Sequence, residues 1–161
     1  MEVDCFNCLP GNLDQVMLNL GYWYQVSDGN PAVMALYRRH YSSQFNRGGP
    51  KCTPPAESKM LLMTADSRAL FVWVFQRYRF DQVDGPICTI FRNEGPYLSS
   101  ELIKEACQLA YTRWPESDLY TYVAPYLIKS TNPGYCFKKS GFEQMPGLSA
   151  RSLILLRRQN A

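Results

Sequence analysis

The chain has 161 residues, of which 46% are hydrophobic, so its length and composition suit one domain, residues 1–161, with a sizeable buried core. Its formal net charge of +3 neither requires nor excludes an anionic ligand or nucleic acid, although it is low for a protein that binds DNA. No apolar run approaches the roughly 20 residues that span a bilayer, and the acidic, polar start shows no secretory signal, so we expect a cytoplasmic protein with no membrane partner.

Residues 1–19 are predicted to be an N-terminal extension that carries Cys5 and Cys8 in a CxxC spacing. A structural zinc site needs four ligands, and the sequence holds no second CxxC and only one histidine. One alternative is a site formed by Cys5, Cys8, Cys52 and His40, but its spacings match no zinc pattern. We therefore predict no metal, and we expect the six cysteines to be reduced thiols.

A strand, a helix and a long loop are predicted for residues 21–58. The segment 21–26 (GYWYQV) indicates a strand that turn residues close at 27–29. A helix is expected to begin at Asn30-Pro31 and to end near residues 40–43, with one apolar side that holds Val33, Met34, Leu36, Tyr37 and Tyr41. Residues 44–58 are rich in Pro and Gly, which predicts a long loop of the kind that often carries function.

Three further strands and a long helix are predicted next. The hydrophobic runs 60–64 and 70–76 predict a β-hairpin, and a charged, aromatic loop at 77–86 leads to a strand at 87–92. Ser99 or Ser100 is expected to cap a helix that ends before Pro115. The buried side of this helix is predicted to hold Leu102, Ile103, Ala106, Leu109 and Ala110.

The stretch NPGYCFKKSGF, from Asn132 to Phe142, lies between two β-like runs, 119–123 and 152–157. Asn132 can cap a helix, and the proline that follows it suits the first helical position. Lys138 and the next lysine complement the dipole of the last turn, and Gly141 stands where a left-handed stop is needed. The stretch therefore predicts a helix of about two turns between two strands.

An Asn-started helix that ends in Lys-x-Gly-Phe before a strand, together with the order β-α-loop-β-β-β-α-β-α-β, resembles the GNAT acyltransferase superfamily over residues 20–158. The resemblance implies a mixed α/β domain in which helices flank a central, mostly antiparallel sheet. It also implies that a splayed strand and the short helix grip the pantetheine arm of acyl-coenzyme A. The expected cofactor is therefore acetyl-CoA, and the expected acceptor is an amine.

The resemblance also implies a set of cofactor-binding residues. In GNAT proteins a Gly-rich turn after the fourth strand cradles the pyrophosphate with backbone N–H groups. The matching positions here are Arg92, Gly95, Ser99 and Ser100, although Pro96 removes one amide donor from this turn. From the short helix the resemblance adds Asn132, Phe137 and Lys138.

Two catalytic roles are expected, a proton donor to the leaving thiolate and a base for the amine. Many GNAT enzymes place a tyrosine where this chain has Phe137, so Tyr135 is the expected substitute, with a packed aromatic as the alternative. Glu94 is the first candidate for the general base, and Asp84 and Asp81 come next.

The segment from Arg38 to Ser43 resembles the Mom-like family of phage DNA-modifying proteins, which are GNAT relatives. The resemblance implies that Tyr41 and Arg92 belong to the active site, and it places His40 at the acceptor pocket. The alternative for His40 is a helix C-terminal cap. Basic and aromatic residues also alternate around Arg77 and Arg79, as in proteins that stack bases and neutralise phosphates.

These features favour an acyltransferase that moves an acetyl-type group to an amine on a modified base of phage DNA, which would place it in the host cytoplasm. One alternative is an acetyltransferase of a small amine or a peptide. Another is a non-catalytic module that binds DNA or acyl-coenzyme A. The expected partners are an acyl-CoA donor and DNA, and the sequence predicts no oligomeric state.

Overall fold

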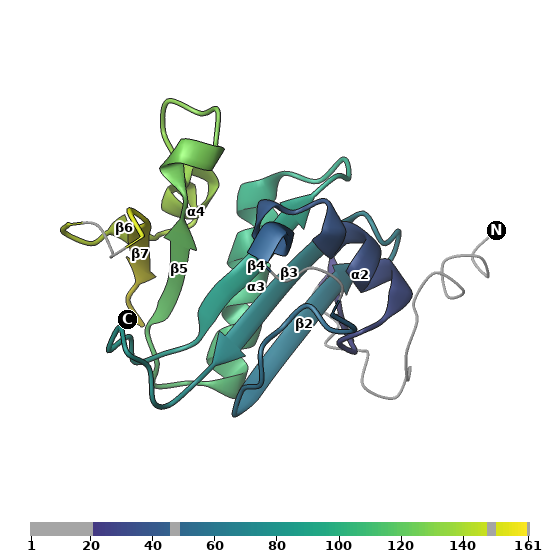
Figure 1. Ribbon diagram of the computed structural model, residues 1–161, viewed down its shortest axis with the longest axis horizontal. Coiled ribbons are helices and arrows are strands. Elements are labelled where there is room, and N and C mark those ends of the chain that lie inside the picture. Colours follow the sequence, from purple (N-terminus) through teal and green to yellow (C-terminus); the bar gives the residue numbers. More distant parts are fainter. Residues whose placement is uncertain (1–20, 46–48, 148–150, 161) are drawn as a thin grey trace.

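The structure, a computed structural model, describes residues 21–45, 49–147 and 151–160 (Figure 1). The predicted extension 1–19, with its CxxC cysteines, lies outside the described residues, as does part of the predicted 44–58 loop. Among the described residues, no helix is both long enough and apolar enough to cross a membrane.

Within the described residues, seven strands form one sheet in the order β1-β2-β3-β4-β5-β7-β6. Their bounds are Trp23–Val26 (β1), Ser58–Thr64 (β2), Ala69–Phe75 (β3), Ile87–Asn93 (β4), Leu119–Val123 (β5), Glu143–Gln144 (β6) and Ile154–Arg158 (β7). Neighbouring strands are antiparallel except β4 and β5, which are parallel. A mixed, mostly antiparallel sheet flanked by helices is the α/β fold class that the sequence predicts, so that prediction is confirmed.

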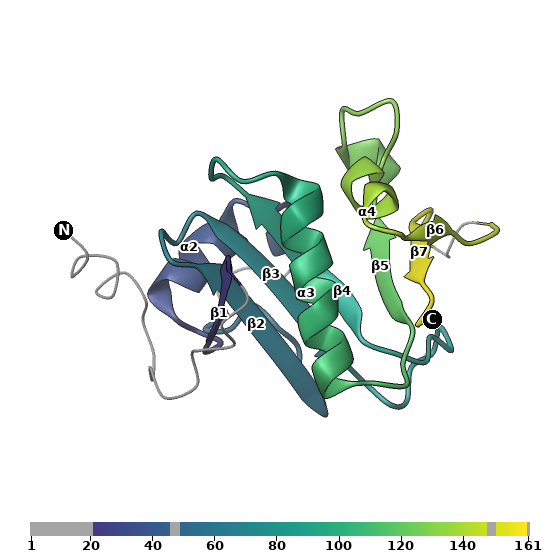
Figure 2. The same cartoon turned by 180° about the vertical axis from the view of Figure 1, so that it is seen from behind.

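Helices cover both faces of the sheet. Helix α2 (Pro31–Arg38) lies on one face, seen in Figure 1, and α3 (Ser99–Arg113) lies on the other, seen in Figure 2. Strand β3 is buried on both sides because Leu70, Val72 and Val74 pack with the α2 core while Phe71 and Trp73 pack with the α3 core. A continuous apolar run is the expected sequence of such a doubly covered strand.

The parallel pair β4–β5 separates soon after it begins. Ile87 is paired with Tyr120 and Cys88 with Thr121, and beyond these the described strands diverge, as both ribbon views show. On its other edge β4 pairs with β3, where Val72 lies opposite Ile90 and the next residue of β3 lies opposite Cys88. Thr89 is therefore the extra residue of a β-bulge, and it lies where the strands part.

The structure confirms some of the predicted helix ends and corrects others. Asn30 caps α2 as predicted, since its side chain accepts the Ala32 N–H at 2.9 Å. The predicted Ser99 or Ser100 cap of α3 is wrong, because the N-cap is Leu98 and no side chain caps the helix.

The short helix α4 (Tyr135–Lys139) is shorter than the motif predicts, and the predicted cap at Asn132 is wrong. Gly134, with φ 77°, is the N-cap and holds a left-handed conformation that prevents the helix from beginning earlier. The end is as predicted: Gly141 has φ 96°, and the N–H of Phe142 donates to the Phe137 carbonyl at 3.1 Å in a Schellman pattern. The sequence also missed β6 and two 3₁₀ turns, η2 (Tyr41–Phe45) and η3 (Pro125–Leu127).

Candidate active site

A pocket of about 230 Å³ opens where β4 and β5 diverge. It is closed on one side by the segment that leads from α2 into η2, and on another by α4 and the residues before it. Its walls are His40, Tyr41, Cys88, Thr89, Phe91, Thr121, Tyr122, Val123, Ile128, Ser130, Asn132, Gly134, Tyr135, Cys136 and Phe137.

 Five of the predicted site residues line this pocket: His40, Tyr41, Asn132, Tyr135 and Phe137. Gly134 also lines it, although the sequence did not predict it as a site residue.

The bulge places one unpaired polar side chain where β4 and β5 part. The hydroxyl oxygen of Thr89 is buried and has no hydrogen-bond partner in the described part of the chain. Cys88, just before it, donates its thiol to the Ile90 carbonyl at 3.4 Å, and burial raises the pKa of this thiol well above its usual value. The thiol therefore stays protonated and is a poor nucleophile.

His40 and Tyr41 form the wall on the α2 side, with ring centroids 4.3 Å apart. The Ser42 N–H donates to Nδ1 of His40 at 3.2 Å, and burial, together with the charge of Arg92, lowers the pKa of His40 to about 4. The ring is therefore neutral near pH 7 and does not act as a charged helix cap. Burial raises the pKa of Tyr41, whose hydroxyl oxygen accepts the backbone N–H of Ala124, so the ring reaches across to the end of β5.

The α4 side offers one exposed hydroxyl and one packed ring. Tyr135 is 52% exposed and begins α4, where its N–H donates to the Asn132 carbonyl at 3.1 Å. Phe137 is buried and packs edge-on against Phe91, with centroids 5.8 Å apart. Lys138 donates to the Asn132 side chain at 2.8 Å. Phe137 therefore shapes the pocket, and Tyr135 is the hydroxyl that α4 presents to it.

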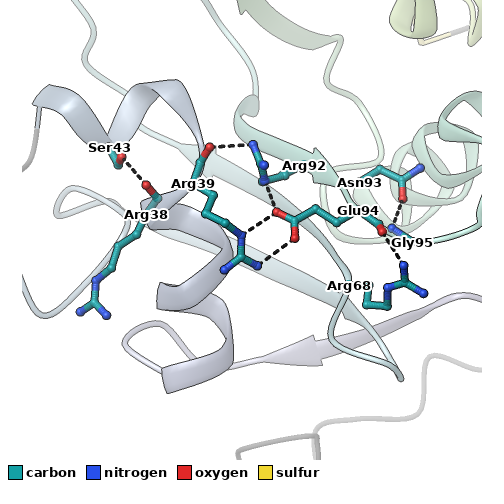
Figure 3. A network of polar contacts seen from close by, with 8 residues as sticks. All are labelled: Arg38, Arg39, Ser43, Arg68, Arg92, Asn93, Glu94 and Gly95. Carbon is teal, nitrogen blue, oxygen red and sulfur yellow. Dashed lines mark hydrogen bonds and ion pairs between the residues drawn. The ribbon is translucent and has the colours of Figure 1, made fainter.

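Glu94 is held between two guanidinium groups, as Figure 3 shows. Arg39 donates to both carboxylate oxygens at 2.7 and 2.9 Å, and Arg92 donates to the same group and to the Arg39 carbonyl. The Arg39 hydrogen bond, followed by that of Arg92, lowers the pKa of Glu94 to about 2. A general base works best with a pKa near the operating pH, so this geometry favours a structural role for Glu94. Neither Glu94 nor Arg92 lines the pocket.

The turn between β4 and α3 is held by hydrogen bonds within the turn. The Gly95 N–H donates to the Asn93 side chain at 3.0 Å, and that side chain donates in turn to Ser99 Oγ, also at 3.0 Å. The Ser100 carbonyl accepts the hydroxyl of Ser140 at 3.0 Å. The residues of this turn that were predicted to bind the pyrophosphate do not line the pocket. The first turn of α3 is the other group of backbone N–H donors that an anion could use.

Arg77 and Arg79 lie elsewhere, at a second hollow of about 1280 Å³. Arg77 forms an ion pair with Glu57 at 3.0 Å, and Arg79 forms one with Asp81 at 2.6 Å. The Arg79 hydrogen bond lowers the pKa of Asp81 to about 2, which makes this further base candidate as weak a base as Glu94. Tyr122 donates its hydroxyl to Asp81 at 2.9 Å, and it lines both hollows.

A comparison with protein-family models found no match, and neither did a comparison with the curated proteins. Among solved structures, the chain is similar to a protein from Bordetella pertussis that is provisionally described as a GnaT-family acetyltransferase. The two share 13% sequence identity, with 88% of this chain and 98% of that chain covered, and the TM-score is 0.48. A likeness of this degree carries no argument about fold or function, so the mixed α/β fold class rests on this chain's own strand order and helices.

Sequence reasoning missed several pocket residues, above all Thr89, Thr121 and Tyr122. Alternation in the run 119–123 predicts a strand, but it does not say which neighbour that strand leaves unpaired. The bulge at Thr89 has no sequence signal, since no Gly or Pro marks it. Among the described residues, no group of three or more His, Cys, Asp or Glu side chains could hold a metal ion.

Proposed function

We propose that this protein transfers a short acyl group from an acyl-coenzyme A thioester to an amine, in the pocket between β4 and β5. The observation that carries the proposal is the divergence of these two strands after Cys88 and Thr121. Their facing edges hold backbone N–H and C=O groups that do not pair with one another, and such groups need partners. A pantetheine arm is an extended chain with two amides, so it can pair with these edges as an added strand would.

The chemistry assigned to the pocket is a direct transfer. The amine nitrogen attacks the thioester carbonyl, a C–N bond forms, the C–S bond breaks, and the thiolate leaves. Cys88 stays protonated and takes no acyl group. Backbone N–H groups at the Thr89 bulge are suited to the oxygen that gains negative charge, because fixed dipoles stabilise such a charge.

Tyr135 is the proposed proton donor to the leaving thiolate, since it is the exposed hydroxyl of α4 at this pocket. The amine must lose its own proton, and the low pKa values of Glu94 and Asp81 make both carboxylates unsuitable acceptors. We therefore propose that the amine enters as the neutral base. The rate should then rise with pH until the amine substrate in solution is fully deprotonated.

The acyl group and the acceptor are finer proposals. A pocket of about 230 Å³ is small for a ligand site, which favours an acetyl-type group over a long chain. For the acceptor we propose an amine on a modified base of phage DNA, because Tyr41 offers a ring at the pocket on which a base can stack. A non-catalytic module that binds acyl-coenzyme A or DNA is the second candidate, favoured by the self-bonded turn at Gly95.

Calorimetric titration with acetyl-coenzyme A tests the donor site, and release of free thiol in the presence of amines tests the transfer. Tyr135→Phe should lower turnover by about 100-fold and leave the donor dissociation constant unchanged, because it removes only the proton donor. Tyr126→Phe is the matched control, since Tyr126 is also exposed but does not line the pocket. Absence of donor binding at millimolar concentration would refute the proposal, and binding without thiol release would favour the non-catalytic module.

A further inference from the structure

The second hollow lies on the sheet face opposite α3. It is lined by Leu155 of β7, by Leu153 just before that strand, by Tyr122 of β5, and by the segment 76–81 after β3, which we call its rim. The side chains of Thr121 and Val123 are buried toward the α3 core side, whereas Tyr122 between them is less buried, as expected for a strand with one covered face. The hollow is about 1280 Å³, above the range of pockets that hold a small molecule.

Two aromatic rings on the rim stand free in solvent. Tyr78 is 92% exposed and Phe80 is fully exposed, although both line the hollow. Large apolar rings gain free energy when they are buried, so a protein that leaves two of them open beside a hollow presents a contact surface. Because the two residues are separated by a single arginine, their rings are spaced along one short segment.

Arginines alternate with these rings. Arg77 pairs with Glu57, and both partners are largely exposed, at 64% and 45% of their side chains, so the pair contributes little and is easily exchanged for another anion. Arg79 is more buried and is tied to Asp81, which holds the rim to Tyr122. The walls thus carry Arg77, Arg79 and Arg151 against two carboxylates, an excess of positive charge.

We propose that this hollow binds a single-stranded nucleic-acid segment, with bases stacked on Tyr78 and Phe80 and a phosphate taken by Arg77. Alternating rings and guanidinium groups match the two parts of such a ligand, since every base has a face that can stack and every linkage is an anion. Tyr122 lines both this hollow and the pocket between β4 and β5, so the two are neighbours. Only delivery of a base to that pocket rests on the proposed acyl transfer, and the binding itself does not.

The test is fluorescence anisotropy with a labelled oligodeoxythymidine of about 12 nucleotides, measured without any acyl donor. Tyr78→Ala and Phe80→Ala should each weaken binding by about fivefold or more, because each removes one stacking surface. Leu98→Ala, at an exposed apolar residue outside the hollow, is the matched control and should change nothing. Neither aromatic contributes a buried contact, so both variants should fold normally.

Arg77→Gln should weaken binding and lower the slope of log affinity against log salt by about 0.7, the value for one phosphate on a single strand. Arg38→Gln, at an exposed arginine of α2 away from the hollow, should leave that slope unchanged. The proposal would be overturned if the oligonucleotide did not bind, or if the Leu98 and Arg38 controls lost as much affinity as the test variants. It would also be overturned if an unrelated acidic peptide displaced the oligonucleotide as readily as nucleic acid does. If thiol is released but the oligonucleotide does not bind, this inference alone is refuted. If the oligonucleotide binds but no thiol is released, only the acyl transfer is refuted.

Discussion

His40 illustrates how burial decides the chemistry of one side chain. In water a histidine changes charge near neutral pH, but here the ring is only 8% exposed and lies near the positive charge of Arg92. Its Nδ1 accepts the Ser42 N–H, so in the neutral ring the proton is on Nε2. A residue that the sequence offers as a charged cap is thus a neutral wall of the pocket.

The pKa of His40, lowered from 6.5 to about 4 by burial, predicts a loss of stability on acidification. Between these values the unfolded chain binds more protons than the folded one, so the free energy of unfolding falls as the pH is lowered from about 6.5 to about 4. His40 should contribute about 3 kcal/mol to this change. Urea denaturation across this range measures it, and His40→Gln should flatten the dependence. Because the chain has one histidine, its NMR titration reports the pKa directly, and a midpoint near 6.5 would contradict the prediction.

At the scale of elements, similar sequence signals at two helix starts have different outcomes. Asn30-Pro31 and Asn132-Pro133 both predict a cap followed by a first turn. Asn30 does cap α2, whereas α4 begins three residues after Asn132, because a glycine follows that proline and takes a left-handed conformation. The short helix is instead fixed at its end, by the Gly141 stop and the contact between Phe137 and Phe142.

Asn30→Ala should therefore lower the free energy of unfolding by about 1 kcal/mol, the usual contribution of an N-cap side chain. Asn132→Ala is the matched variant and should cost clearly less, because its exposed side chain caps no helix and accepts a hydrogen bond from Lys138 at the surface. Chemical denaturation of the two variants beside the unchanged protein measures the difference. An equal loss at both positions would show that Asn132 also stabilises a helix start.

At the scale of the whole molecule, Asp28 joins three segments that are distant in sequence. It follows β1, accepts the Cys52 N–H at 2.9 Å and the Lys59 ammonium at 3.1 Å, and also accepts the Thr53 hydroxyl. Its side chain is only 4% exposed. The contacts fix the described end of the long loop to the turn before α2 and to β2. Burial by itself would raise the pKa of Asp28, but the hydrogen bonds from Thr53 and Cys52 outweigh it and lower the pKa to about 2.

Asp28→Ala should lower the free energy of unfolding by about 3 kcal/mol, because it leaves the buried donors and Lys59 without their partner. Glu116→Ala, at an exposed carboxylate, is the control and should change stability by less than about 0.5 kcal/mol. Since the pKa is lowered from 3.8, the contribution of Asp28 is present above that pH and is lost as the pH falls toward about 2. Denaturation curves of both variants at neutral and acidic pH check this, and equal curves would contradict it.

The sequence by itself determined the order and type of most elements. Local periodicity and backbone conformation are properties of a few adjacent residues. They explain the unbroken apolar run of β3, the alternation in 119–123, the Asn30 cap and the Gly141 stop. Those signals were sufficient to predict a mixed α/β sheet, and the GNAT-like reading came from the resemblance of the element order and the motif.

Only the tertiary structure decided how the site is assembled. The divergence of β4 from β5, the bulge at Thr89 and the approach of Tyr41 to Ala124 each depend on contacts between distant segments. The role of Glu94 also depends on distant contacts. Its sequence position predicts a carboxylate without a partner, whereas the fold places it between two arginines. Local patterns carry no information about such contacts, because burial and charge pairing are set by which segments meet in space, and these decide the pKa and the role of each side chain.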